Sequence, residues 1–272
     1  MAANPYASPF RRHAVAGMNA LLVMVHVGAG MIWWWWGWPW GLAALMVVGL
    51  GLAGCTLYPH CRVFGSATRR IPCATRSVVL TIDDGPGDDT GEILRLLAAH
   101  RVRAVFFLIG ERAARRPDDV RRIVAAGHLL GNHTQTHPCY GYWGYPPWSQ
   151  RREVRQCQQV LTEITGRAPR LFRAPAGLRN PYCNLIAAEA GLEVTGWQAR
   201  GFDGVHTPVG KVLATLRRGL GPGAIVLVHQ GMPHSTEVLR RVLEMLAAEG
   251  WTTTLPEAWL NPVPAGTPPA SC

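Results

Sequence analysis

The residues best suited to chemistry lie in two short polar segments. The first, T-I-D-D-G-P at 81–86, follows an apolar run that predicts a buried strand, so Asp83 and Asp84 leave a strand end and enter a loop. The second, H-T-Q-T-H at 133–137, places two histidines four residues apart. This is the spacing of one helical turn, from which both imidazoles could reach a single ion. Together the segments offer two imidazoles, one carboxylate ligand and one carboxylate to spare.

Two later polar segments also follow apolar runs. R-A-P-A-G begins at Arg173, and I-V-L-V-H ends at His229. Barrel and open α/β folds keep their chemistry at the carboxyl ends of their strands. Four such segments in one chain therefore indicate a single site built from several strand ends, rather than isolated turns and surface histidines.

In their order along the chain and in their sequences, these segments resemble the motifs of the polysaccharide deacetylases with a NodB-homology domain. Members of this family are carbohydrate esterases that remove N-acyl groups from amino sugars. The matching motifs are T-I-D-D-G-P, G-N-H-T-Q-T-H from Gly131, R-A-P-A-G, and L-V-H at 227–229. The resemblance covers about residues 76–255. It implies an α/β fold, a distorted (β/α) barrel of about seven parallel strands.

The resemblance also implies which residues hold the metal and move protons. Asp84, His133 and His137 would hold a divalent metal, with zinc expected and cobalt or another divalent ion as alternatives. Asp83 would be the general base, and His229 would protonate the leaving amine. Amide hydrolysis at neutral pH needs these two proton transfers together with a stabilised oxyanion.

The remaining motif residues are expected to shape the pocket. Arg173 would orient the base and balance its charge. The backbone N–H of Ala176, which follows Pro175, would complete the oxyanion site. Leu227 and Trp197 would wall the pocket for the acyl methyl group, although Leu227 is equally suited to a place in the core.

The fourth motif departs from the family pattern, which carries an Asp, two further residues and then Asp-Trp. Aligned from Trp197, this chain has Arg200 in place of the first acid and Gly204 in place of the Trp. Asp203 is retained, and we expect it to set the charge state of His229. Without that carboxylate, a nearby arginine would lower the pKa of the histidine and weaken it as an acid.

The N-terminal region has the composition of a membrane anchor. Residues 13–61 contain no Asp, Glu, Lys or Arg. Since about 20 apolar residues span the hydrocarbon, we predict two transmembrane helices, at 14–35 and 41–57, with Pro39, flanked by Gly37 and Gly41, as the break. Six tryptophans would lie at one interface, where the amphipathic indole is favoured: Trp33, Trp34, Trp35, Trp36, Trp38 and Trp40.

The distribution of arginine predicts the topology. Arginines flank both ends of the apolar region, which places both ends in the cytoplasm. We therefore expect an integral protein of the bacterial inner membrane with its catalytic domain on the cytoplasmic face. The alternative is a lipid anchor at Cys55, in the sequence L-A-G-C, with the domain on the periplasmic side.

The net charge is +10, and Lys211 is the only lysine. No nucleic-acid motif accompanies this charge, so an anionic membrane surface is the expected partner and nucleic acid is not. Seven cysteines without C-x-x-C spacing indicate neither a disulfide framework nor a zinc knuckle. Nothing in the sequence indicates the oligomeric state.

The domain organisation follows from the alternation of apolar and amphipathic stretches. We assign a membrane anchor at 1–60, a linker at 61–75, the NodB-homology domain at 76–255 and a tail at 256–272. Strands are predicted near 78–82, 103–108, 128–131, 170–173, 193–197, 224–228 and 251–254. Helices are predicted near 90–100, 117–126, 149–165, 181–190, 208–219 and 235–249. Alternation of this kind is typical of a parallel sheet or barrel.

The expected function is hydrolysis of the N-acyl amide of an amino sugar in an envelope polysaccharide or a lipid-linked glycan precursor. One alternative is a deformylase of a lipid-linked amino sugar, and another is a non-catalytic carbohydrate-binding relative, suggested by Arg200. The aromatic segment 140–148 could stack on sugar rings or pack within a loop. Arg179 could meet a phosphate, whereas Asn180 before Pro181 is typical of a helix entry.

Overall fold

Eight parallel strands form the framework of the region that follows the apolar segment. The computed structural model describes residues 9–139, 141–205 and 207–260. Seven strands hydrogen-bond in the order β5-β4-β3-β2-β1-β7-β6, and β8 pairs with the start of β1. The strands are β1 Ser77–Gly85, β2 Val105–Leu108, β3 Leu129–Asn132, β4 Leu171–Phe172, β5 Glu193–Val194, β6 Ala199–Arg200, β7 Ile225–His229 and β8 Thr252–Thr253. The sheet curls into a half-barrel, which confirms the predicted fold class.

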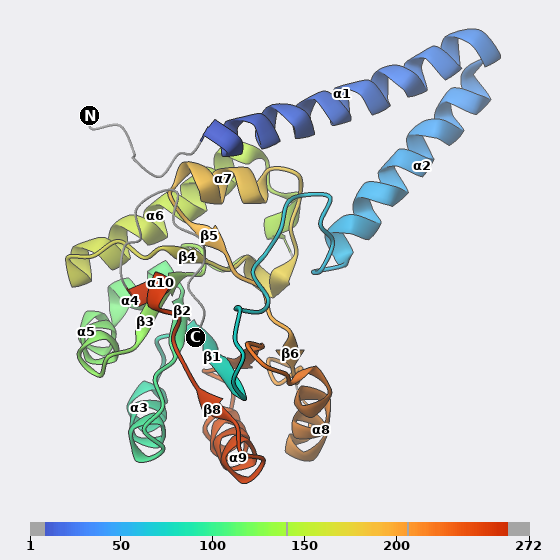
Figure 1. Cartoon of the computed structure of the whole chain (residues 1–272). Helices are drawn as coiled ribbons and strands as arrows, with labels where there is room; N and C mark the ends of the chain where they lie inside the picture. Colours follow the sequence, from blue (N-terminus) through green and yellow to red (C-terminus); the bar gives the residue numbers. More distant parts are fainter. Residues whose placement is uncertain (1–8, 140, 206, 261–272) are drawn as a thin grey trace.

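Helices connect the strands and cover the outside of the curled sheet (Figure 1). They are α3 Thr90–Ala99, α4 Gly110–Arg115, α5 Pro117–Ala125, α6 Pro147–Thr165, α7 Cys183–Glu189, α8 Val209–Gly219, α9 Ser235–Ala248 and α10 Glu257–Leu260. Two single turns of 3-10 helix lie at Tyr142–Gly144 and Pro175–Gly177. Because parallel strands need crossover connections, this covering of helices follows from the strand order.

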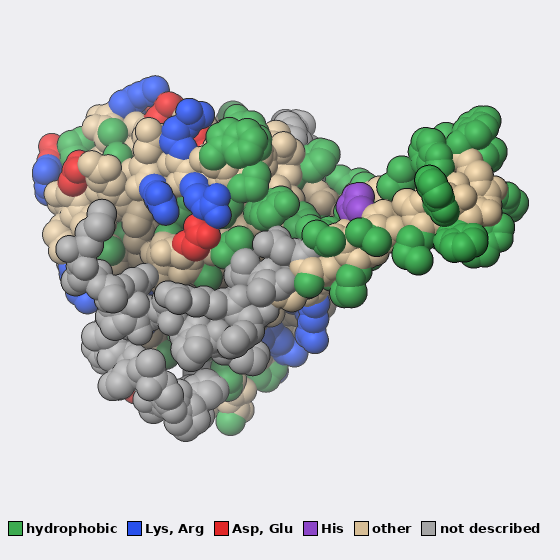
Figure 2. Space-filling model, turned by 90° about the horizontal axis from the view of Figure 1, so that it is seen from above, with side chains coloured by type: hydrophobic (Ala, Val, Ile, Leu, Met, Phe, Trp, Pro, Cys, Tyr) green, Lys and Arg blue, Asp and Glu red, His purple; other side chains and the backbone are tan. Residues whose placement is uncertain are grey.

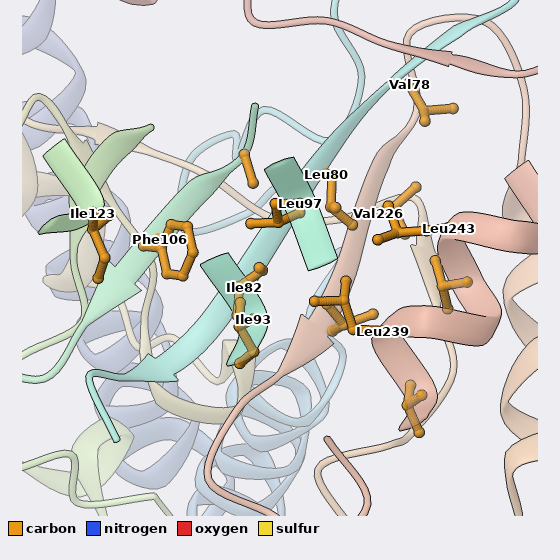
Figure 3. Packing of buried hydrophobic residues seen from close by; sticks show 14 of the residues in the cluster. Val78, Leu80, Ile82, Ile93, Leu97, Phe106, Ile123, Val226, Leu239 and Leu243 are labelled. Carbon is orange, nitrogen blue, oxygen red and sulfur yellow. The ribbon is translucent and has the colours of Figure 1, made fainter. Parts of the chain in front are cut away.

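The alternation of side chains along β1 separates the core from the site. Leu80 and Ile82 belong to the cluster between the sheet and the helices, where they pack with residues such as Leu97 of α3 and Leu243 of α9 (Figure 3). Val79 lies in a separate cluster inside the curl of the sheet. Since successive side chains of a strand point to opposite faces, the odd-numbered positions of β1 lead towards the inside.

Most predicted elements match the structure to within a few residues at each end. Besides the two single turns of 3-10 helix, two internal elements were not predicted. Strand β6 has only two residues and no apolar run to mark it, and α4 has six residues, too few to show a helical period. Of the predicted tail, α10 forms its first part, and residues 261–272 lie outside the described residues.

The apolar region forms a helical hairpin that projects from the domain (Figures 1 and 2), and hydrophobic side chains cover most of its surface in Figure 2. Its helices are α1 Pro9–Trp36 and α2 Trp38–Leu57. Among the described residues, α2 is the one helix long and apolar enough to cross a bilayer, with a mean hydropathy of 1.9. The apolar part of α1, Ala20–Trp36, is shorter.

The break in the hairpin lies at Gly37 and not at Pro39. Gly37 adopts φ 89, a conformation that glycine tolerates, whereas Pro39 lies in the first turn of α2. A helix accepts proline there because that N–H has no partner within the helix. Gly41 permits close approach of the two helices, since a Cβ at this position would lie 2.4 Å from Cβ of Trp33.

The stretch predicted as a linker, 61–75, is built into the domain. Phe64 is 2% exposed and Ile71 is 7% exposed. Thr68 forms a parallel bridge with Thr195, just after β5, and Arg70 forms an antiparallel bridge with Ala224. The stretch therefore lies across the gap between β5 and β7, which ties the hairpin directly to the barrel.

Candidate active site

The two carboxylates at the end of β1 reach the same side of the sheet because the strand is irregular there. The register with β2 shifts between Asp83 and Gly85, which marks a bulge. Asp84 adopts φ 69, in the left-handed region. In a regular strand, neighbouring residues would face opposite sides. Instead, Asp83 Oδ2 lies 3.6 Å and Asp84 Oδ1 lies 3.4 Å from Nε2 of His133.

The two histidines of the second motif also converge, but not through a helix. Residues 133–137 form a loop after β3, so the predicted helical turn was wrong. Thr134 with φ 70 and His137 with φ 53 adopt left-handed backbone conformations that fold the loop back on itself. The imidazole rings of His133 and His137 consequently lie 4.7 Å apart, centroid to centroid.

A buried glutamate of α6, which sequence reasoning missed, holds this loop. Glu153 is 4% exposed and accepts hydrogen bonds from the backbone N–H groups of Gln135 at 3.0 Å and Thr136 at 2.9 Å. Its other oxygen accepts a bond from the Thr136 hydroxyl at 3.0 Å. The only signal in the sequence was a charged residue at a position that the helical pattern of α6 would bury.

Asp84, His133 and His137 form a cluster whose ligand atoms all lie within 4.8 Å of one another. Asp84 Oδ1 lies 3.2 Å from Nε2 of His137, and it is buried without a hydrogen-bond partner among the described residues. His133 directs Nδ1 at the carbonyl oxygen of Arg173, 2.8 Å away, which leaves Nε2 to face the carboxylates. Two imidazole nitrogens and one carboxylate oxygen are a donor set that fits a divalent metal such as zinc.

The charge states of the cluster follow from burial and mutual contact. Burial, followed by the neighbouring His133, lowers the pKa of His137 to about 4, so its imidazole is neutral at neutral pH. Burial alone would raise the pKa of Asp84, but the adjacent His133 and His137 outweigh it and hold that pKa below its usual range. A neutral imidazole beside an ionised carboxylate is the state that metal binding requires.

Arg173 crosses the interior of the half-barrel to reach Asp83, the expected base. Its Nη1 donates to Asp83 Oδ1 at 2.6 Å and to the Thr81 hydroxyl at 2.8 Å, and Nη2 donates to the carbonyl of Gly196 at 2.8 Å. The guanidinium also lies over the ring of Phe107, 4.1 Å from its centroid. Both members of the Arg173–Asp83 pair are buried, so each depends on the other for its charge.

His229 ends β7 directly beside Asp83 of β1. Its Nδ1 lies 3.1 Å from Asp203 Oδ1, and its backbone N–H donates to Asp203 Oδ2 at 2.6 Å. Burial lowers the pKa of His229, but the hydrogen bond and charge of Asp203, helped by Asp83 and Asp84, outweigh burial and raise that pKa overall. The retained carboxylate of the fourth motif therefore contacts the histidine as expected.

The two substitutions in the fourth motif also contact the site. Gly204 lies against the imidazole of His229, because a Cβ at this position would lie 3.1 Å from three ring atoms. A tryptophan could not occupy this place without a shift of the backbone or of the ring. Arg200 is half-buried, with its guanidinium 4.9 Å from the Trp197 ring centroid and 4.7 Å from that of Phe202.

The residues predicted to wall the pocket lie around Arg173. Trp197 is 5% exposed and lies 5.9 Å from the guanidinium carbon of Arg173. Pro175 is buried, and Ala176 adopts φ 52 and ψ 8 in the turn that follows Arg173. Leu227 is 1% exposed in β7 and shares its face of the strand with His229, so it contributes to the core as well.

Arg179 and Asn180, which were considered from the sequence, have structural roles. Arg179 is 5% exposed and its donors bind backbone carbonyls, among them that of Cys61 at 2.7 Å. Asn180 Oδ1 accepts a bond from the Tyr182 N–H just before α7, as expected for a helix entry. In the aromatic segment, Tyr142 is buried whereas Trp148 is 72% exposed, and Tyr140 lies outside the described residues.

The parallel half-barrel brings a carboxylate, an arginine and paired histidines around a three-residue cluster that could hold a metal ion, an arrangement typical of hydrolases. The sequence profile of the family described as polysaccharide deacetylase matches residues 71–195. A chitooligosaccharide deacetylase of Bradyrhizobium sp. (strain ANU 289) is 38% identical over 165 residues, which cover 60% of this chain and 74% of that relative. The chain therefore belongs to the polysaccharide deacetylase family, and it is a hydrolase that acts on the carbon–nitrogen bonds of linear amides.

Solved structures agree with this family. The crystal structure of a peptidoglycan N-acetylglucosamine deacetylase has a TM-score of 0.65 at 28% identity, and the match covers 72% of this chain and 92% of that one. A CE4 family pseudoenzyme from Bacillus anthracis has a TM-score of 0.64 at 26% identity, over 71% of this chain and 68% of that one. Enzymes and a pseudoenzyme thus share the fold, and the side chains at the site decide between them.

Proposed function

We propose that this protein is a membrane-anchored, divalent-metal-dependent deacetylase that removes the N-acetyl group from N-acetylglucosamine units of an envelope glycan or its lipid-linked precursor. The observation that carries the proposal is the arrangement of two supported proton-transfer groups around one ligand cluster. Asp83 is held by Arg173 and His229 is held by Asp203. The relatives named above act on chitooligosaccharides or peptidoglycan, both built from acetylated amino sugars.

A divalent ion held by Asp84, His133 and His137 would supply a Lewis acid that polarises the acyl carbonyl and acidifies water. Asp83 accepts the proton of the attacking water, and Arg173 orients Asp83 and balances its charge. His229 gives its proton to the amine as the carbon–nitrogen bond breaks. Asp203 stabilises the imidazolium and fixes the orientation of its ring.

The presence of both proton-transfer groups, each with its supporting partner, favours catalysis over binding alone. A lectin gains nothing from a buried carboxylate and arginine beside a metal site, because burying two charged groups costs on the order of several kcal/mol of desolvation free energy for each ion.

The membrane location rests on the helical hairpin. Helix α2 has the length and apolar composition of a span, and tryptophans near the turn of the hairpin are largely exposed, with Trp34 at 84% and Trp38 at 63%. Indole rings favour the membrane interface. With arginines at both ends of the apolar region, we place the catalytic domain on the cytoplasmic face, where a lipid-linked glycan would be the substrate.

The test is acetate release by the purified, zinc-loaded full chain in detergent, with N-acetylglucosamine oligomers as substrate. Asp83→Asn and His229→Ala should each keep zinc and lose about a hundredfold or more in turnover. Asp118→Asn, in an exposed ion pair on α5, is the control and should turn over normally. Absence of acetate release, with formate released from a formamido sugar instead, would replace the deacetylase with the deformylase.

A further inference from the structure

The segment that follows α2 contacts the residues around the candidate active site through one pair of side chains, His60 and Trp197. Helix α2 ends at Leu57, and His60 lies shortly after it. The imidazole of His60 lies 6.2 Å, centroid to centroid, from the ring of Trp197. Trp197 in turn lies beside Arg173, the partner of the base Asp83. The residues just after α2 are therefore connected to the expected base through Trp197 and Arg173.

This junction is held in place by a buried arginine. Arg179 donates to the carbonyl oxygens of Pro59 at 3.2 Å, Cys61 at 2.7 Å and Gly65 at 3.0 Å, and to the side chain of Asn184 at 2.9 Å. These bonds use both terminal nitrogens of its guanidinium, so Arg179 acts as a clamp and not as a ligand for substrate. The position of the domain relative to the end of α2 is consequently fixed.

Positive charge gathers at the same place. The guanidinium of Arg200 contacts the rings of both Trp197 and Phe202, and such contacts restrict the movement of a planar guanidinium. The side chain of Arg69 packs on Gly196, where a Cβ would lie 3.1 Å from its Cγ. Burial, then Arg69, Arg179 and Arg200, lower the pKa of His60, which shows that the fields of three arginines converge there.

We propose that Arg200, with Arg69 and His60 behind it, forms an anion subsite between the membrane and the catalytic centre that binds the phosphate joining an amino sugar to a lipid carrier. This inference rests on the proposed function and names its substrate class. A guanidinium matches phosphate in a two-point hydrogen bond. The acid that the family places at position 200 would repel a phosphate, and a neutral polymer offers no charge for an arginine to bind.

The experiment measures dissociation constants by calorimetry on the zinc-loaded full chain in detergent. The ligands are glucosamine, glucosamine 1-phosphate, inorganic phosphate and a short-chain polyprenyl-phosphate glucosamine, none of which has an acyl group to lose. Wild-type protein should bind glucosamine 1-phosphate roughly tenfold or more tighter than glucosamine, as expected for one charge-assisted contact, and the lipid-linked form at least as tightly. Arg200→Gln should abolish this ratio, and Arg200→Lys should keep part of it.

Arg95→Gln, on the exposed face of α3, is the matched control and should leave the ratio unchanged. A ratio that survives in Arg200→Gln would show that the phosphate binds elsewhere, including at the metal, and would overturn the inference. An equal loss in Arg95→Gln, or inorganic phosphate binding as tightly as the sugar phosphate, would also overturn it. Acetate release from neutral oligomers tests the proposed function separately, because a chain that deacetylates them without any phosphate preference refutes the subsite alone.

Discussion

At the scale of single residues, the metal cluster depends on backbone conformations that side chains other than glycine seldom adopt. Asp84, Thr134 and His137 all have positive φ. Each such residue costs about 1–3 kcal/mol, and such costs gather at functional sites. Their occurrence on both loops of the cluster indicates that these loops are shaped for the ligand atoms rather than for stability.

The first prediction concerns these ligands. Asp84→Ala and His133→Ala should each purify with at least roughly tenfold lower zinc occupancy and without deacetylase activity, because two protein ligands do not hold the ion as three do. Elemental analysis measures the occupancy. His100→Ala, at an exposed position after α3, should keep full occupancy. Full zinc content in either ligand variant would exclude this metal site.

The second prediction concerns the His229–Asp203 pair. Asp203 raises the pKa of His229 above its ordinary value, so a histidine that must be protonated to act as an acid stays active to higher pH. Asp203→Asn removes that anion, lowers the pKa of His229, and should move the alkaline limb of the pH–rate profile to lower pH.

The control for this pair is Asp89→Asn, because Asp89 also binds a residue next to the site, the side chain of Gln230, but not His229 itself. Its alkaline limb should match that of the wild type. A limb that does not move in Asp203→Asn would reduce Asp203 to a loop residue that only bonds the backbone of His229.

At the scale of elements, the active-site loops are supported from helices packed outside the sheet. Helix α6 supplies Glu153 to the loop 133–137, and it also contacts the side chain of Asn132, whose Nδ2 donates to the carbonyl of Val154 at 2.8 Å. Asn132 Oδ1 then accepts a bond from the Thr134 N–H at 3.0 Å. One helix therefore fixes both ends of the turn that brings the histidines together.

The third prediction tests this support. Glu153→Gln replaces two carboxylate oxygens that accept three bonds with one oxygen and an NH2 group that faces donors. Zinc affinity should fall roughly tenfold to a hundredfold, as for other residues that orient metal ligands, and chemical unfolding should show a loss of about 1–3 kcal/mol of stability. Glu163→Gln, exposed on the same helix, should change neither. Unchanged zinc affinity in Glu153→Gln would mean that the loop holds its shape unaided.

At the scale of the whole molecule, the hairpin and the domain form one connected body. The stretch after α2 bridges to residues beside β5 and β7, and Arg179 clamps its start. A flexible tether would let the domain sample many distances from the bilayer, whereas in the proposed membrane-anchored protein this junction would hold the pocket near the membrane surface. This arrangement suits a substrate that is itself in the membrane.

The fourth prediction concerns the face of the membrane. If α1 crosses the bilayer together with α2, as we propose, the arginines at both ends of the apolar region would place the C-terminus in the cytoplasm. A cytoplasm-only fluorescent protein fused after Cys272 should therefore fluoresce, and an alkaline phosphatase fused there should be inactive. Active phosphatase without fluorescence would place the domain outside and would favour the lipid anchor at Cys55, which Cys55→Ala would then abolish.

The sequence alone determined the order of the strands and helices and the identity of the polar motifs. Apolar runs such as 225–228 and the 3.6-residue period of α9 are local signals, because burial of one face depends on neighbouring residues in the chain. The motif residues Asp84, His133 and His229 were likewise evident from their places at strand ends. Elements too short to show a period, such as α4, could not be predicted in this way.

The tertiary structure decided how those residues meet. Arg173 and Asp83 are 90 residues apart in the chain, and Glu153 binds a loop 17 and 18 residues before it, so no local pattern links them. The bulge at Asp84 arises from the shift in register between β1 and β2, a property of the pair and not of either strand. Long-range packing fixes such contacts, and it is therefore packing that turned separate motifs into one site.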